Sequence, residues 1–495
     1  MNANPARFAL RDIPRLPLSA FRAGVIGAVK EGKTLLALCA MPAGQNMILC
    51  AALGLRRKGE IEIVLSEPVG DSYPALTPDC PQAHLFEREI AEQYDIRPEG
   101  HPWLKPVRFH QPRRQGASVF PGAPRPGVCD YFAMSGESVH EVAVGPVHAG
   151  IIEPGHFRFQ CNGEHVFHLE IELGYQHRGI ETALAANPKR RLFYMEAAAG
   201  DTTIAHTTAY CRALQALSGA SADERTDALR AAALELERLA NHTGDLGAMA
   251  GDIGYLPTMS FCGRLRGDYL NMTALLCGSR FGRGLFGEKG AKHELSIDTA
   301  SELLNRLSRT ARDTETAIDL LWDTPSVLAR FEETGKLAPQ IARQLGLVGP
   351  AARACGMKLD ARRDFPTGYY SKNPLEPALC HTGDVYARAR VRWLEIRNSL
   401  ETVQRAAQQA VGPLEPEDTG SLAPESMAVA LEEGWRGEIC HLARTDKNGL
   451  LDFYKVTDPS FKNWAGLAMS LRDQQVSDFP LCNKSFNLSY CGHDL

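Results

Sequence analysis

"TLLALCAMPAGQNMILCAALGL", residues Thr34–Leu55, is the stretch that decides how the chain begins. It carries no charge and is long enough to cross a bilayer as a helix. Pro42, Gly44, Gln45 and Asn46 nevertheless cluster at its centre, and such a cluster favours a turn. We therefore predict two buried strands joined by a turn. The chain is then expected to be soluble, or to meet a membrane only through partner subunits.

The residues around this stretch indicate an α+β domain. "EIEIVLSEP" (60–68) alternates apolar and polar residues, as a half-buried strand does. Residues 81–106 read as an amphipathic helix followed by a Pro- and Gly-rich loop. Residues 113–138 are rich in Pro, Gly and Arg, which predicts a linker or an extended arm. The predicted N-terminal domain therefore covers residues 1–112.

Residues 139–495 indicate a mainly α-helical bundle with small flanking β-sheets. Strands are predicted within 139–150 and 155–175, with a hairpin turn at 161–164 and helices after Gly179. "SADE" (Ser221–Glu224) is predicted to be a capping box. Its helix carries one apolar face, formed by Leu229, Ala232, Leu236, Leu239, Thr243 and Leu246. A helix over 384–406 carries the stripe Val385, Ala389, Trp393, Ile396, Leu400 and Val403. The Arg and Glu residues of this second helix are predicted to face solvent or a partner, and the tail to return to strands and loops.

Composition excludes some classes of function. The chain has 495 residues, 44% hydrophobic and 23% charged, with a formal net charge of −5. These values are typical of a globular protein and do not favour binding to nucleic acid. The first residues lack the apolar core of a signal peptide, and no two of the thirteen cysteines form a C-x-x-C pair. We therefore expect reduced thiols that mostly fill the core.

Several long motifs carry a resemblance to known families. "FEREIAEQYDIRPEGHPWLKPVRF" (86–109) resembles the 30-kDa subunit of respiratory complex I. Residues 145–159, "ELGYQHRGIE" (172–181) and "ELERLANHTGDLGAMAGDIGY" (235–255) resemble two related proteins. These are the complex I 49-kDa subunit and the large subunit of membrane-bound (group 4, formate-hydrogenlyase-like) NiFe-hydrogenases. The resemblance implies a 30-kDa-like domain (1–112), a linker (113–138) and a hydrogenase-large-subunit or 49-kDa-like domain (139–495).

The resemblance also implies that the metal site has degenerated. Aligning "MEAAAGDTTIAHTTAYC" (195–211) and "VSDFPLCNKSFNLSYCGHDL" (476–495) with the hydrogenases places Ala199, Thr202, Ser489 and Gly492 at the four cysteine positions. Thiolates are soft ligands that retain nickel, whereas protonated hydroxyls are hard and bind such metals poorly. We therefore expect no metal in this chain and no hydrogenase activity, and leave open whether the chain is an enzyme at all.

Two further residues are candidates for a proton relay. Glu181 stands where the families keep an acid beside the buried site, and burial can raise the pKa of a carboxylate. His206 lies one helical turn after Thr202. The structural alternatives are an ionic contact of Glu181 with Arg178 or with a helix end, and a hydrogen bond from His206 to a backbone carbonyl.

A quinone site is only half present. A Tyr of the 49-kDa protein contacts the quinone head beside a loop His, but here the Tyr position falls near Gly200 and holds no Tyr. His148 or His156 could stand for the loop His. The emptied metal pocket is expected to be filled in one of two ways. Either waters link Thr202, Thr203, Ser489, His206 and Glu181, or Phe486 and Tyr490 have moved in.

The resemblance implies a place in a larger assembly. It implies a small subunit with a 4Fe-4S cluster and antiporter-like membrane subunits as partners, with the chain peripheral on the cytoplasmic side of the inner membrane. We expect a redox-complex subunit that couples electron transfer to proton or ion movement. Two alternatives stay open: a non-catalytic scaffold that holds the small subunit to the membrane subunits, and an enzyme that uses quinone or another ligand in the former metal pocket.

Overall fold

The N-terminal sheet confirms the predicted strand pair. The computed structural model describes residues 1–114, 119–120, 125–148, 153–417 and 419–495. Strands β4 (Thr34–Ala43) and β5 (Asn46–Leu55) are antiparallel, and β6 (Glu60–Ser66) pairs with β5. The sheet order is β1-β6-β5-β4, with β3 beside β6. The predicted strand at 60–68 is thus β6.

Both faces of β4 and β5 are covered, which explains why this stretch has no charge. Side chains such as Leu38 and Leu49 pack with Phe21 of α1 (Leu18–Lys30) and Phe86 of α2 (His84–Tyr94). The alternate side chains pack instead against a second sheet, through residues such as Leu431. A strand buried on both faces reads as a continuous apolar run, and so resembles a membrane segment in composition.

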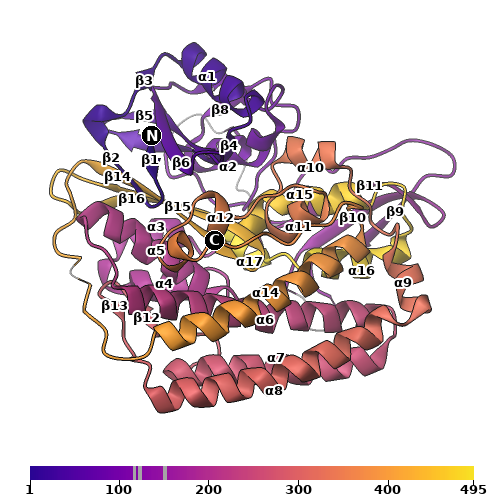
Figure 1. Ribbon diagram of the computed structural model, residues 1–495. Helices are drawn as coiled ribbons and strands as arrows, with labels where there is room; N and C mark the ends of the chain where they lie inside the picture. The colour runs from indigo at the N-terminus through magenta and orange to yellow at the C-terminus, as the bar shows by residue number, and fades with distance from the viewer. Residues whose placement is uncertain (115–118, 121–124, 149–152, 418) are drawn as a thin grey trace.

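The second sheet joins the two ends of the chain. Its order is β16-β15-β14-β2, from β2 (Ala6–Ala9), β14 (Ser426–Gly434), β15 (Gly437–Thr445) and β16 (Leu451–Thr457). The side chain of Asn4 accepts from Leu431 N–H at 2.9 Å and donates to Leu431 C=O at 3.0 Å. Figure 1 shows this sheet between the N-terminal domain and the helices below.

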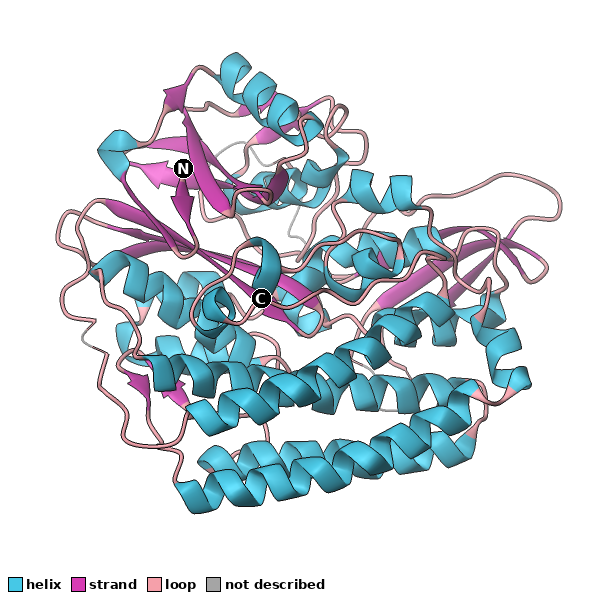
Figure 2. Cartoon of the chain, in the orientation of Figure 1, coloured by secondary structure: helices cyan, strands magenta, loops and turns pink. Residues whose placement is uncertain are grey.

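A third sheet lies at the far side of the bundle. It contains β9 (His140–Val144), β10 (His156–Asn162) and β11 (His165–Glu172) in the order β11-β10-β9. Asn162 pairs with His165, which confirms the predicted hairpin turn. Figure 2 shows this sheet apart from the other two. Residues 115–118 and 121–124 of the predicted linker, and 149–152 of the β9–β10 loop, lie outside the described residues.

Long helices form the bundle. They are α5 (Thr203–Ser218), α6 (Glu224–Asp252), α7 (Leu256–Cys277), α8 (Ile297–Trp322) and α14 (Val385–Gln409) (Figure 1). Helix α6 packs against α5, α7 and α14 and is buried on nearly all sides, because it is the centre of the bundle. None of the described helices is both long and apolar enough to span a membrane. The mixed fold class predicted from the sequence is confirmed.

Three local predictions were wrong in whole or in part. Helix α6 is capped by Asp223, which accepts from the N–H groups of Arg225 and Thr226, and not by Ser221. On α14, Arg397, Glu401 and Arg405 are exposed as predicted. In contrast, Arg388, Arg392 and Glu395 are buried in ion pairs and hydrogen bonds, because this helix has neighbours on several sides. The tail contains the predicted strands as β15 and β16, but three helices follow β16: α15 (Pro459–Ser470), α16 (Phe479–Phe486) and α17 (Tyr490–Asp494).

The remaining elements are short. They are β1 (Asn2–Ala3), β3 (Arg15–Leu16), β7 (Ser72–Pro74), β8 (Arg97–Glu99), α3 (Ile180–Ala186), α4 (Arg191–Glu196), β12 (Phe286–Gly287), β13 (Gly290–Ala291), α9 (Pro325–Phe331), α10 (Pro339–Leu345), α11 (Gly349–Ala354), α12 (Ala361–Asp364) and α13 (Tyr369–Lys372). The thirteen cysteines are free thiols, and most of them are buried.

Candidate functional site

Two distant segments lie against one another where the metal site was expected. The turn before α5 (196–202) faces the C-terminal segment (487–495). The guanidinium of Arg178 joins them, because its Nη2 donates to the carbonyl of Ala198 at 2.8 Å and to that of Cys491 at 3.1 Å. The fold therefore brings together the two segments that carry Ala199, Thr202, Ser489 and Gly492.

The polar side chains at these positions are engaged in local hydrogen bonds. Thr202 Oγ1 lies 3.1 Å from Asp201 Oδ1. Ser489 Oγ accepts from Gly492 N–H at 2.9 Å and so caps α17. A side chain at Gly492 would meet the carboxylate of Asp458.

The donor set does not fit a nickel–iron centre. Ala199 and Gly492 offer no ligand atom, and two neutral hydroxyls cannot replace four thiolates. Within the described residues, no group of three or more His, Cys, Asp or Glu side chains is placed to hold a metal ion.

Arg436 is the residue of this site that the sequence analysis missed. It lies in the tight turn between β14 and β15, and its guanidinium donates to both carboxylate oxygens of Asp201 at 2.6 and 2.8 Å. It also donates to Thr202 Oγ1 at 3.2 Å and to the carbonyl of Asn487 at 2.5 Å. The guanidinium stacks 3.8 Å from the ring of Trp435. A cationic side chain thus ties the two facing segments together.

In the sequence analysis, Phe486 and Tyr490 are one of two fillings expected for the metal pocket. The guanidinium carbon of Arg388 lies 4.4 Å from the centre of the Phe486 ring. Tyr490 packs edge-on against Trp464 with the ring centres 4.9 Å apart. Both rings belong to the packing behind the C-terminal segment. Whether these rings or waters fill the space between the two facing segments stays a prediction.

His206 belongs to a buried chain of hydrogen bonds. Its Nε2 lies 3.0 Å from Asp458 Oδ2, and its Nδ1 lies 3.1 Å from His441 Nε2. His441 Nδ1 lies 2.9 Å from the hydroxyl oxygen of Tyr454. All four side chains are buried. The side chain of His206 therefore joins two other titratable groups, where a bond to a backbone carbonyl was the structural alternative.

The two ends of this hydrogen-bonded chain differ in the charge state that their surroundings favour. Burial alone would raise the pKa of Asp458, but the hydrogen bond and charge of His206, with Ser460 N–H, lower it. Burial holds the pKa of His441 well below its ordinary value, and the neighbouring His206 lowers it further. Burial also raises the pKa of Tyr454 well above its ordinary value. His441 is therefore neutral, and its Nε2 faces the Nδ1 atom of His206.

Glu181 lies in a different cluster. Its Oε1 accepts from Lys455 Nζ at 2.8 Å and from Val456 N–H at 3.1 Å. Burial would raise its pKa, but Lys455, Arg108 and Arg113 outweigh burial and lower the pKa to about 2. The expected raised pKa was therefore wrong, because β16 supplies a buried lysine that the sequence does not place there. The expected bridge to Arg178 is also absent, since the Arg178 guanidinium bonds carbonyls instead.

Glu237 is a second residue beside this site that the sequence analysis did not single out. Its Oε2 accepts from Ile204 N–H at 2.8 Å, at the first turn of α5. Burial raises its pKa to about 8, and the nearby carboxylate of Asp201 adds to this effect. The sequence does show an acid within this central helix, which could have pointed to Glu237. It does not show that the partner of this acid lies on α5.

The loop between β9 and β10 meets the C-terminal segment. Glu153 Oε2 accepts from Tyr490 N–H at 3.2 Å. His148 Nε2 lies 2.9 Å from the carbonyl of Gly155, and His156 Nδ1 lies 3.2 Å from that of Gly145. The Nε2 atom of His156 is buried without a partner among the described residues. The two histidines thus brace the base of the loop beside the candidate site.

Comparison with known proteins agrees with this geometry. Residues 29–115 match the model of the respiratory-chain NADH dehydrogenase 30 Kd subunit, and residues 252–432 match that of the 49 Kd subunit. Formate hydrogenlyase subunit 5 of Escherichia coli is 29% identical over 449 residues, which are 87% of this chain and 78% of the relative. NADH-quinone oxidoreductase subunit 4 of Thermus thermophilus is 26% identical over 363 residues, 68% of this chain and 89% of the relative.

The chain is a fusion of complex I 30-kDa-type and 49-kDa-type domains, related to membrane-bound hydrogenase large subunits. Membrane-bound hydrogenase subunit alpha of Pyrococcus furiosus, 25% identical over 356 residues, belongs to the same group of relatives. It covers 68% of this chain, and the chain covers 83% of it. The family resemblance of the sequence motifs is therefore confirmed. The boundaries at 112 and 138 stay predictions.

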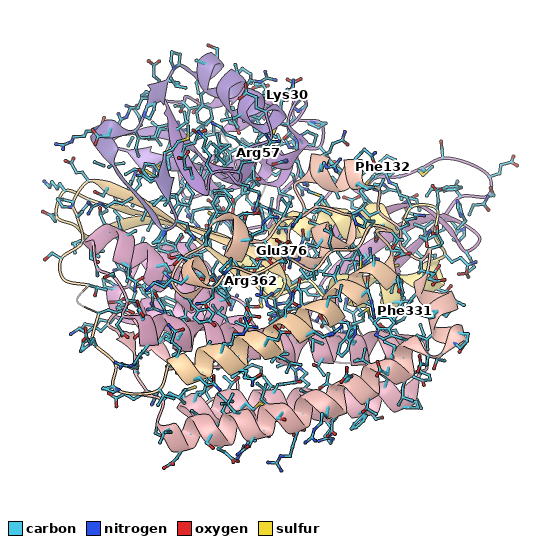
Figure 3. All side chains as sticks on the ribbon, viewed as in Figure 1. Lys30, Arg57, Phe132, Phe331, Arg362 and Glu376 are labelled. Carbon is cyan, nitrogen blue, oxygen red and sulfur yellow. The ribbon has the colours of Figure 1, made fainter. Side chains whose placement is uncertain are left out.

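The fused subunit holds a buried ion network behind the two facing segments. Arg362 of α12, labelled in Figure 3, donates to Asp360 and Glu235 at 2.6 and 2.8 Å. Arg353 reaches Glu395 and Glu433 at 2.6 and 2.8 Å. The network joins α6, α11, α12, α14 and β14. The charged residues of "ARRDFPTGYY" (361–370) therefore take part in packing between these elements and do not form a separate site.

Proposed function

We propose that the fused subunit serves a membrane-associated redox complex in which a buried polar network has replaced the hydrogenase metal centre. In this role it couples electron transfer in a partner subunit to proton movement. The observation that carries the proposal is Arg436, which joins Asp201, Thr202 and Asn487 between the two segments that would carry the metal ligands. The relatives named as hydrogenase and NADH-quinone oxidoreductase subunits support the redox class.

The degenerate metal site follows from the chemistry of the donors. A guanidinium hydrogen-bonded to both segments brings a positive charge of its own, which opposes the approach of a metal cation. The nearest thiol on the C-terminal segment is Cys491, and burial raises its pKa, so that it stays protonated. We therefore propose that the chain holds no nickel and is not an active hydrogenase.

The proton relay is proposed to run through His206. An imidazole can accept a proton on one nitrogen and release one from the other. In the chain Asp458–His206–His441–Tyr454, the carboxylate orients the ring of His206 through its Nε2, and His441 receives or returns the proton at Nε2. Glu237 of α6 is a further proton donor near neutral pH. Its carboxyl lies at the start of α5, the helix that carries His206. Glu181, held as a carboxylate by Lys455, is proposed to keep its negative charge in that ion pair and not to move a proton.

The partners are proposed from the relatives. We propose a small subunit with a 4Fe-4S cluster and antiporter-like membrane subunits, with the chain peripheral on the cytoplasmic side of the inner membrane. A bound quinone would lie beside the β9–β10 loop, where His148 and His156 contact backbone carbonyls of the loop and Glu153 contacts the C-terminal segment. The competing role is a scaffold that keeps the interfaces and carries no proton, and the buried network behind the site is compatible with it.

The test uses the intact complex in vesicles with a pH-sensitive dye inside. Electron flow from a reduced viologen to a soluble quinone is followed together with proton movement. We expect His206→Gln to lower proton-coupled electron transfer by about tenfold or more, since removal of a general acid–base group costs about 10²–10⁴ in a fully dependent step. The matched control is His165→Gln, whose ring is half-exposed on the β10–β11 turn.

Two outcomes separate the alternatives. Equal electron and proton rates for His206→Gln and the wild type would eliminate the relay and favour the scaffold. An effect of Glu181→Gln equal to that of His206→Gln would move the relay to the Lys455 cluster. Metal analysis of the same preparation is expected to find nickel well below one atom per chain.

A further inference from the structure

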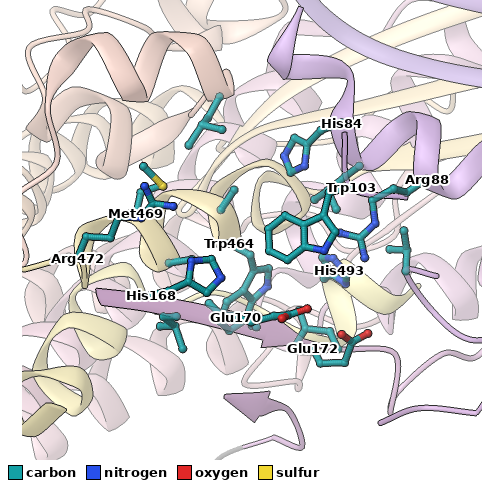
Figure 4. Close-up of a pocket in the computed structure, with 18 residues that line it drawn as sticks. His84, Arg88, Trp103, His168, Glu170, Glu172, Trp464, Met469, Arg472 and His493 are labelled. Carbon is teal, nitrogen blue, oxygen red and sulfur yellow. The ribbon is translucent and has the colours of Figure 1, made fainter. Parts of the chain in front are cut away.

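A second pocket lies away from the facing segments, between the 30-kDa-type domain and the rest of the chain. Its volume is about 230 Å³. Helix α2, strand β11 and helix α15 form its walls, and Leu345 of α10 and His493 of α17 complete them. Figure 4 shows Trp103, His168 and Trp464 gathered at its centre, with Glu170 and Glu172 on one side. Nothing in the proposed redox role uses this pocket.

The pocket is apolar and aromatic, but its lining includes two polar nitrogen atoms without partners. Trp464 is 3% exposed, and its Nε1, a donor, has no hydrogen-bond partner among the described residues. The Nε2 atom of His168, a donor or an acceptor according to the tautomer, is also buried and unpartnered among the residues that the structure describes. An unsatisfied buried polar atom costs free energy, so two of them on residues that line one cavity indicate an absent partner.

The rim is built to hold a flat molecule. His168 lies 4.5 Å from the ring centre of Phe132 and 5.9 Å from that of Trp103. Trp103 lines the pocket and is 41% exposed, so its ring remains accessible at the mouth. Met469 adds a flexible apolar wall.

The charges around the pocket favour a neutral ligand. Glu170 is paired with Lys105 at 2.5 Å, and burial raises the pKa of Glu172 to about 7. Burial lowers the pKa of His168 and lowers that of His84 to about 3, so both rings are neutral. Arg88 keeps its charge, but its guanidinium already donates to the carbonyls of Lys105 and Pro106. The other groups of the wall therefore favour a neutral ligand.

We propose that this pocket binds a small, flat, neutral, mostly apolar molecule whose oxygen atom accepts a hydrogen bond from Trp464 Nε1, with His168 Nε2 as the second contact. An apolar cavity of about 150 Å³ holds one benzene ring, so this pocket has room for a two-ring compound. The site belongs to the junction of the two fused domains, because α2 supplies one wall and α15 the opposite wall.

The test uses the full chain and two fluorinated probes followed by ¹⁹F NMR. 2-Acetyl-6-fluoronaphthalene carries the acceptor oxygen, and 2-ethyl-6-fluoronaphthalene has nearly the same shape without it. We expect saturable binding of the acetyl probe. Trp464→Phe should weaken its binding about fivefold, the effect of one net hydrogen bond, and should leave the ethyl probe unchanged. The control is Trp322→Phe, since Trp322 Nε1 is also buried without a partner among the described residues but lies outside this pocket.

Filling the pocket gives an independent result. Ala468→Phe, at a partly exposed wall position, should abolish binding of both probes, and Ala465→Leu serves if that variant is unstable. Binding that survives both fillings would place the probe elsewhere and overturn the proposal. The same holds if no saturable binding is found, or if Trp464→Phe weakens both probes equally.

Discussion

Replacing Arg436 by Met tests whether its guanidinium holds the two facing segments together. Met has a similar length but neither charge nor donors, so Asp201, Thr202 and the carbonyl of Asn487 lose their common partner. The Arg436 side chain is 4% exposed and that of Asp201 is 32% exposed. Breaking a buried ion pair costs about 3–5 kcal/mol. Because the Asp201 carboxylate recovers part of its hydration, we expect a loss of about 3 kcal/mol in the free energy of unfolding.

Urea unfolding of the full chain measures this loss as a shift of the midpoint at constant m-value. The matched control is Arg264→Met, which breaks two half-exposed pairs with Asp268 and Asp313. Exposed pairs contribute about 0–1 kcal/mol, so the control should change stability little. The double variant with Asp201→Asn should show a coupling energy of about 2 kcal/mol. If Arg436→Met costs no more than Arg264→Met, or if the coupling is zero, the bridging role of Arg436 is refuted.

Three further predictions concern stability. Glu181 has an ordinary pKa of 4.5 and a folded pKa of about 2, so its stabilising effect is present above pH 4.5 and is lost as pH falls toward 2. Lys455→Met should flatten this loss in urea midpoints at pH 3 and 6, and an unchanged slope would contradict the assignment to Lys455. Glu237 has the opposite sign, since its folded pKa of about 8 favours the protonated form: its contribution is present below pH 4.5 and is lost as pH rises through 8. Glu237→Gln should therefore remove a decline in stability between pH 6 and 9, and a decline that persists would point to another group. Asp223→Ala should cost about 1 kcal/mol through loss of the α6 cap, whereas Ser221→Ala should cost nearly nothing, and equal costs would restore Ser221 as the cap.

Local patterns of the sequence were sufficient for the elements whose contacts are local. The strands β4 and β5 follow from an apolar run interrupted at Pro42 and Gly44, and the β10–β11 turn follows from "CNGE". The motifs of residues 86–109 and 172–181 were long enough to identify the family. The four positions at which the resemblance implies lost ligands were also visible in the sequence, and that loss stays a prediction.

Only the tertiary structure decided which charged side chains are buried together. Lys455 and Glu181 are 274 positions apart along the chain, and His206 and Asp458 are 252 apart. A pKa depends on the charges within a few ångströms and on burial, and both are fixed by the packing of distant elements rather than by neighbours in sequence. The raised pKa expected for Glu181 therefore belongs to Glu237. Arg436 reaches the two facing segments from a turn whose place beside Asp201 is set by the pairing of β14 with β15 and by the packing of α5 against that sheet.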